Sequence, residues 1–107
     1  MEARRHKRLI VSLPAEIIAE DTHITGSIEN LSDEGLYLVT APSKTSLNIK
    51  SDVPVELSIT FPSGEKINIT CKVKWSYPTP PHGYTNSLGL GILEKPPEYK
   101  LALQTIL

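Results

Sequence analysis

Residues 53–75 read VPVELSITFPSGEKINITCKVKW, and this stretch decides the fold class. Apolar side chains take every second position over residues 53–61 and again over residues 66–75. That spacing is the period of a strand with one buried face. The four residues between the two runs, Pro-Ser-Gly-Glu, are turn formers at hairpin length. The stretch therefore predicts two antiparallel strands joined by a tight turn.

Four less regular segments also predict strands, because they are rich in β-branched and apolar residues and are bounded by Gly, Asp, Ser or Pro. They are residues 10–20, 23–30, 35–40 and 87–93. Many short strands with little helix favour an all-β fold, a closed barrel or a sandwich, because closure removes the exposed edges of a small sheet. The proline-rich residues 77–86 are predicted to form a loop.

The C-terminal residues 96–107 are predicted to form a short helix, because the pair Pro96-Pro97 suits a helix start. Its apolar side is expected to come from Tyr99, Leu101, Leu103, Ile106 and Leu107. The length of 107 residues suits one domain. We therefore expect a single domain over residues 1–107, with a basic arm at 1–9, a barrel at 10–94 and the helix at 96–107.

Charge balance and cysteine count exclude several classes of protein. With 11 Lys+Arg against 12 Asp+Glu, the chain lacks the broad positive field that binds long nucleic acids. Cys71 is the single cysteine, so no intramolecular disulfide can form, and no Cys/His group has the spacing of a zinc site. No stretch reaches the ~20 apolar residues of a membrane span. We expect a cytoplasmic protein without membrane insertion.

The N-terminal arm carries concentrated positive charge. Arg4, Arg5, Lys7 and Arg8 fall within five residues, opposed nearby only by Glu2. Because so few apolar side chains could hold this arm to a core, we expect it to be flexible without a ligand and to become ordered on binding one.

Two short motifs carry a resemblance to a known family. Arg4 and Arg8 fit R-x-x-x-R, and residues 30–35, NLSDEG, fit N-x-S-x-x-G. In this order and at this separation, the motifs resemble those of the PilZ domain family. The VKW at residues 73–75 and the GLGI at residues 89–92 are similar to the ends of that family's last two strands.

The resemblance covers nearly the whole chain and implies both a fold and a function. The implied fold is a six-stranded antiparallel PilZ-type β-barrel followed by a helix. The implied function is that of a cyclic di-GMP receptor, which binds this bacterial second messenger and relays the signal to a protein partner. The resemblance implies no enzymatic activity and no cofactor besides that ligand.

The resemblance makes Arg4 and Arg8 ligand-binding residues, with Arg5 as a secondary candidate. An arginine can hydrogen-bond guanine O6 and N7 as a planar fork, pair with phosphate, or stack on a base. Arg4 and Arg8 are at most about 14 Å apart along an extended chain, so one compact ligand can contact both. The alternative is a solvated basic run.

The second motif assigns Asn30, Ser32 and Gly35 to the same site. The Asn30 carbonyl can accept from guanine N1–H or N2–H, and the Ser32 hydroxyl suits a phosphate oxygen or an amino group. Gly35 is expected to take a positive φ beneath the ligand. An ordinary turn between strands is the alternative, and both readings can hold together. Asp33 and Glu34 are expected to face solvent.

Trp75 has two interpretations. Its indole can stack on a guanine, as a tryptophan at this strand position does in some PilZ proteins. Its phase continues the buried face of the strand, however, and this favours core packing.

The main alternative function is a nucleotide-independent PilZ-like adaptor for protein interactions, whose members usually lack the arginine motif. A small barrel that binds single-stranded nucleic acid is disfavoured by the few aromatic residues and the negative net charge. An enzyme is disfavoured because Cys71 has no identifiable base nearby and no catalytic motif is present. The sequence does not identify the downstream partner.

Overall fold

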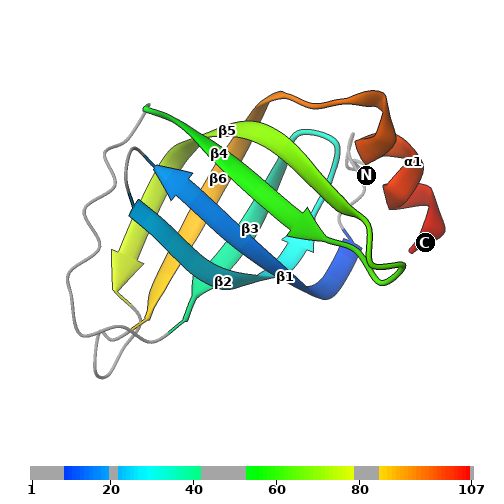
Figure 1. Ribbon diagram of the computed structural model, residues 1–107. Coiled ribbons are helices and arrows are strands. Elements are labelled where there is room, and N and C mark those ends of the chain that lie inside the picture. The colour runs from blue at the N-terminus through cyan, green and yellow to red at the C-terminus, as the bar shows by residue number, and fades with distance from the viewer. Residues whose placement is uncertain (1–8, 20–21, 42–52, 79–84, 107) are drawn as a thin grey trace, which may run out of the picture.

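Six antiparallel strands close into a barrel in the computed structural model, which describes residues 9–19, 22–41, 53–78 and 85–106. Neighbouring strands follow the order β1-β2-β3-β6-β5-β4 around the barrel (Figure 1). The elements are β1 Leu9–Ala19, β2 Thr22–Leu31, β3 Gly35–Thr40, β4 Pro54–Thr60, β5 Lys66–Pro78, β6 Asn86–Glu94 and the helix α1 Pro97–Thr105. The predicted all-β barrel with a C-terminal helix is therefore confirmed.

The hairpin that decided the fold class forms as predicted. In the β4–β5 pair, Leu57 lies opposite Ile69 and Ile59 lies opposite Ile67. Gly64 in the connecting turn has a φ of 93°, a conformation that glycine adopts without steric cost. The barrel closes where Ala15–Ile18 of β1 pair with the other edge of β4.

Most boundaries lie within one or two residues of the predicted ones, and two of the differences bear on the candidate site. The predicted loop 77–86 is shorter, because β5 continues to Pro78 and β6 begins at Asn86. Of the predicted arm at residues 1–9, Leu9 is the first residue of β1, and Arg4, Arg5 and Arg8 lie outside the described residues.

The core lies inside the barrel and is built from the alternating apolar positions of the strands. Among the described residues, the strand side chains with no solvent exposure are Ile17, Ile28, Leu31, Leu38, Leu57, Ile59, Cys71 and Leu88, and Tyr99 of α1 is equally buried. Each fully buried apolar side chain of this size contributes roughly 1.5–3 kcal/mol to folding. Phe61 is buried as predicted, whereas Val53 lies just before β4 and is 40% exposed.

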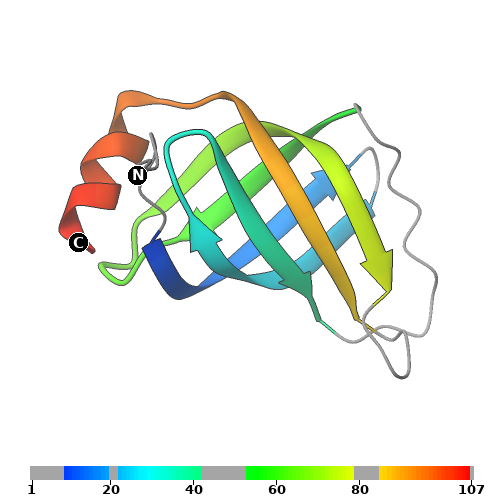
Figure 2. The same ribbon diagram turned by 180° about the vertical axis from the view of Figure 1, so that it is seen from behind.

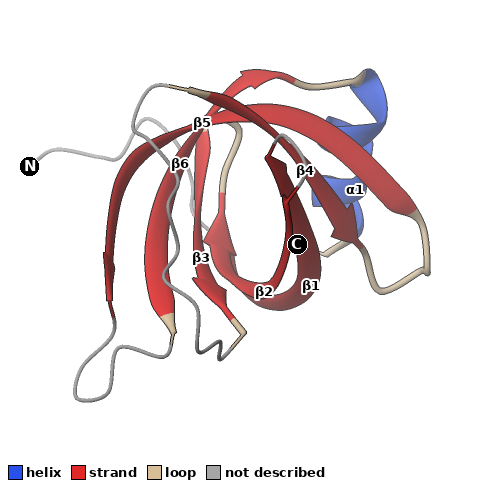
Figure 3. Cartoon of the chain, turned by 60° about the vertical axis from the view of Figure 1, so that its left-hand side comes forward, coloured by secondary structure: helices blue, strands red, loops and turns tan. Residues whose placement is uncertain are grey.

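Helix α1 covers one end of the barrel, beside the turn that joins β4 to β5 (Figure 1). Figure 3 shows the strands curving around a common interior, with the helix outside it. Tyr99, Ala102 and Leu103 are buried, at the three- and four-residue spacing of one helical face. Leu101 is 61% exposed, so its assignment to the apolar side was wrong, because it falls on the opposite face.

No helix among the described residues is long and apolar enough to cross a membrane.

Candidate functional site

Residues Ser32–Gly35 form the turn between β2 and β3, here called the motif turn. The Ser32 amide donates to the Gly35 carbonyl over 2.9 Å. The Ser32 hydroxyl accepts from the amides of Glu34 and Gly35, and it is also 3.3 Å from the Gly35 carbonyl oxygen. Ser32 is 4% exposed. The serine of the second motif is thus a turn-forming residue, and a ligand contact from its hydroxyl stays a prediction.

The motif turn is held by the C-terminal end of β6, by Lys95 after it and by α1, which lie at the same end of the barrel (Figure 2). The Tyr99 hydroxyl of α1 donates to the Ser32 carbonyl over 2.8 Å. The Lys95 ammonium donates to the Asp33 carbonyl, and the Ile92 amide donates to the Glu34 carbonyl over 2.9 Å. Carbonyls of three successive residues are therefore satisfied by groups far along the chain, which fixes the shape of the turn.

Tyr99 remains a donor at any ordinary pH. Burial raises its pKa, and the nearby Cys71 and Asp33 add to the effect. The Phe61 and Tyr99 rings also pack in a T-shaped arrangement, with the ring centroids 6.5 Å apart.

Removing the Tyr99 hydroxyl is expected to destabilise the fold. Tyr99→Phe keeps the ring but leaves the buried Ser32 carbonyl without this donor, which should lower the free energy of unfolding by about 0.5–1.5 kcal/mol. Urea denaturation measures the change. Tyr77→Phe is the matched control, because Tyr77 is 58% exposed, and a change within about 0.5 kcal/mol is expected there. Equal stabilities of the two variants would contradict the role of Tyr99.

Gly35 does not have the backbone conformation that was expected, and its place in the ligand site stays a prediction. Among the described glycines, the positive φ belongs to Gly64, so the prediction of a positive φ at Gly35 was wrong. A Cβ atom on Gly35 would instead lie 2.9 Å from the carbonyl oxygen of Leu90 in β6. Glycine is needed here because β3 and β6 approach closely at the point where the motif turn ends.

A row of residues crosses the outer face of the barrel beside the motif turn. Asn30 of β2 lies opposite Tyr37 of β3. Tyr37 also lies opposite Gly89 of β6 on its other side. Gly89 in turn lies opposite Trp75 of β5. Residues directly opposite in antiparallel strands point to the same face. The residues on either side of Tyr37 are buried, so the row faces outward. Asn30 and Trp75 lie three strand spacings apart, about 14 Å.

Tyr37, Trp75 and Tyr77 form a group of contacting rings on this face, here called the aromatic platform. The Trp75 ring centroid lies 5.7 Å from that of Tyr37 and 5.1 Å from that of Tyr77, with the second pair stacked. The Tyr37 hydroxyl donates to the Ser87 hydroxyl oxygen over 3.0 Å. Trp75 remains 37% exposed and Tyr77 58% exposed. The platform therefore offers an aromatic surface to solvent.

The interpretation of Trp75 as a core residue was wrong. Val73 is buried in the core, but the β5–β6 register shifts by one residue between Val73 and Trp75. Such a bulge reverses the inside–outside alternation, so Trp75 emerges on the outer face. Sequence reasoning also missed Tyr37 and Tyr77. The signal for Tyr37 was present, because it alternates with Leu36 and Leu38 in a strand whose inner face is apolar.

The basic arm joins the barrel next to the motif turn. Leu9, the first described residue, pairs with Leu31, which directly precedes Ser32. Ile10 pairs with Asn30 and is 92% exposed, so it continues the outer-face row on β1. The register thus fixes where the arm is attached, and the positions of its arginines stay predictions.

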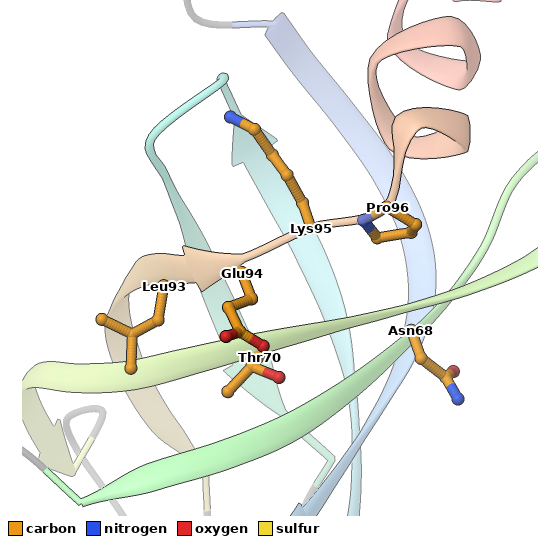
Figure 4. Close-up of a pocket in the computed structure, with 6 residues that line it drawn as sticks. All are labelled: Asn68, Thr70, Leu93, Glu94, Lys95 and Pro96. Carbon is orange, nitrogen blue, oxygen red and sulfur yellow. The ribbon is translucent and has the colours of Figure 1, made fainter.

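A separate hollow of about 550 Å³ lies on the outside of β5, beside the segment that joins β6 to α1 (Figure 4). It is lined by Asn68, Thr70, Leu93, Glu94, Lys95 and Pro96. None of these residues belongs to either sequence motif, and the Lys95 ammonium is used at the motif turn. We assign no function to this hollow.

The structure gives Cys71 no catalytic character. Its side chain has no solvent exposure, and burial, with a smaller contribution from Glu56, raises the pKa of its thiol to about 12. The thiol therefore stays protonated at neutral pH and is a poor nucleophile. Among the described residues, no group of three or more His, Cys, Asp or Glu side chains could hold a metal ion.

The barrel, its capped end and the outward-facing polar and aromatic row define a small all-β module. The family model described as the PilZ domain matches residues 2–107, and the chain belongs to the PilZ family. Proteins of this family are binding and effector modules, not enzymes. A search of the curated proteins found no match.

Several solved structures share the fold. The Bacillus subtilis inhibitor of motility MotI (DgrA) matches with a TM-score of 0.78 and 20% identity, over 99% of this chain and 50% of that one. The PilZ domain of Escherichia coli YcgR with c-di-GMP matches with a TM-score of 0.73 and 13% identity, over 98% and 88%. The K. pneumonia MrkH–c-di-GMP complex matches with a TM-score of 0.74 and 13% identity, over 99% and 51%.

The chain thus spans about half the length of the MotI and MrkH chains and most of the YcgR domain. At these identities, the likeness shows the fold.

Proposed function

We propose that this chain is a cyclic di-GMP receptor module that binds the nucleotide on the outer face of β2, β3, β6 and β5, and relays the signal to a protein partner. The observation that carries the proposal is the row that aligns Asn30 with Tyr37 and Trp75 beside the motif turn. Membership of the PilZ family and the presence of c-di-GMP complexes among the similar structures support it.

The chemistry of this face suits a guanine nucleotide. The exposed Trp75 ring can stack on a purine, and stacking on an aromatic side chain contributes about 1–3 kcal/mol per base. The Asn30 carbonyl can accept from the guanine N1–H or N2–H. Asn30 and Trp75 are about 14 Å apart, so a ligand with two bases can contact both ends of the row.

The arm supplies the positive charge that a ligand with two phosphates requires. Arg4, Arg5 and Arg8 are joined to β1 at Leu9, whose partner Leu31 adjoins the motif turn. Arginines entering from this point can pair with the phosphates or form the planar fork to guanine O6 and N7. In this proposal the motif turn itself acts mainly as a rigid support, because its serine hydroxyl is used internally.

Isothermal titration tests the proposal. Cyclic di-GMP should bind and be recovered unhydrolysed. Cyclic AMP should not bind, because it lacks guanine O6 and the second base. The absence of binding to cyclic di-GMP would favour the nucleotide-independent adaptor, and equal affinity for both nucleotides would contradict selective recognition of cyclic di-GMP.

A further inference from the structure

Two glycines of β6 lie beneath two side chains of β5. A Cβ atom on Gly89 would lie 2.2 Å from the Trp75 ring. One on Gly91 would lie 2.8 Å from Cε of Lys74 and 3.7 Å from its ammonium nitrogen. Distances of 2.2 Å and 2.8 Å are too short for two non-bonded carbon atoms. The side chains of Trp75 and Lys74 can therefore lie flat across β6 only because residues 89 and 91 are glycines.

The bulge in β5 places these two neighbouring side chains on the same face. Leu90 lies opposite Val73 and Gly89 lies opposite Trp75, which leaves Lys74 as the extra residue between them. In a regular strand, two consecutive side chains would point to opposite faces. Here Lys74 and Trp75 are both exposed. A cation and an aromatic ring therefore stand side by side on the outer face.

Lys74 lies near the motif turn. Gly91, which its side chain crosses, pairs with Gly35 at the end of the turn. The Trp75 ring crosses Gly89, and Gly89 pairs with Tyr37. Within the part of the chain that the structure describes, the Lys74 ammonium has no hydrogen-bond or ion-pair partner. Its methylene stem rests on the glycine backbone while the charge stays accessible.

We propose that Lys74 is a further ligand-binding residue, whose ammonium pairs with a phosphate of the nucleotide that stacks on Trp75. Gly89 and Gly91 are positioning residues that hold the ring and the cation flat. This inference rests on the proposed nucleotide site. Consecutive Cα atoms are about 3.8 Å apart, so the base and the phosphate of one nucleotide can reach both side chains.

The test is a titration of the full chain with cyclic di-GMP. Binding is monitored by calorimetry and by the fluorescence of Trp75, the single tryptophan. Lys74→Gln should weaken binding by about fivefold at low salt, the upper end for an exposed ion pair. The difference should shrink as salt is added, because the lost contact is between charges. Lys74→Arg should keep most of the affinity. Lys66→Gln is the matched control, since Lys66 is exposed on the same strand about 26 Å away, and it should bind as the wild type does.

Gly91→Ala tests the positioning role. The added methyl meets the far end of a flexible lysine, so the protein should fold while Lys74 is displaced. Binding should weaken as in Lys74→Gln, and the double variant should lose no more than either single variant. A methyl group that merely blocked the ligand would still weaken binding in the Lys74→Gln background, and this result would overturn the positioning role.

The outcomes separate the inference from the proposed function. If the wild type binds and Lys74→Gln binds equally well, the role of Lys74 is wrong and the receptor function stands. If the wild type does not bind cyclic di-GMP, both are wrong. If Gly91→Ala fails to fold, the comparison of Lys74→Gln with Lys74→Arg still decides the role of the lysine.

Discussion

Replacing Arg8 with alanine is expected to lower the affinity for cyclic di-GMP by about ten- to a hundredfold, because a charge-assisted hydrogen bond contributes roughly 1.5–3 kcal/mol. Arg8 directly precedes Leu9, the first residue of β1, and so belongs to the arm that joins the barrel beside the motif turn. The free energy of unfolding should stay nearly the same, because an arginine side chain is rarely buried in a core. Calorimetric titration and urea denaturation measure the two quantities.

Arg8→Lys is the sharper control. Lysine keeps the charge but loses the planar fork and the stacking surface, so its affinity should be close to that of the alanine variant. At position 74, by contrast, exchange between lysine and arginine should matter little. Full affinity in Arg8→Lys would show that binding requires only a positive charge at this position. The proposed recognition of guanine by Arg8 would then be wrong.

Replacing Ile69 with alanine is expected to have the opposite effect. Ile69 is 2% exposed and pairs with Leu57 in the hairpin that decided the fold class. Truncation of a buried isoleucine lowers the free energy of unfolding by about 2–5 kcal/mol. The folded fraction should bind cyclic di-GMP with unchanged affinity, because Ile69 points into the core and away from the outer face.

Ile10→Ala is the matched control for stability. Ile10 is 92% exposed, and the same truncation there should change the free energy of unfolding by less than about 0.5 kcal/mol. Urea denaturation of both variants gives the comparison. A destabilisation at Ile10 as large as that at Ile69 would contradict the assignment of the core.

The fold was predictable because its signal is local. Alternation along residues 53–61 and 66–75 is visible in a window of ten residues, and it is preserved wherever a strand has one face in the core. The errors lie where the period is interrupted. The bulge between Val73 and Trp75 is a property of the pairing with β6 and leaves no mark in the sequence of β5 alone.

The candidate site was only partly predictable, because its geometry depends on register between distant strands. The motifs singled out Asn30 and Gly35, but the row that joins Asn30 to Trp75 depends on the pairing of Tyr37 with Gly89, which are 52 positions apart in the sequence. Gly35 was assigned a turn conformation, whereas its requirement arises from the Leu90 carbonyl in β6. The Ser32 hydroxyl accepts hydrogen bonds within its own turn, and its contact with a ligand stays a prediction.

The most direct test of the site is a nuclear magnetic resonance titration of the ¹⁵N-labelled chain with cyclic di-GMP. We expect chemical-shift changes at the amides of Asn30, Tyr37 and Gly91 and at the Trp75 indole, with Glu16 and Glu56 on the opposite strands unchanged. Shifts confined to β1 and β4, or none at saturating nucleotide, would contradict binding on the outer face of β2, β3, β6 and β5.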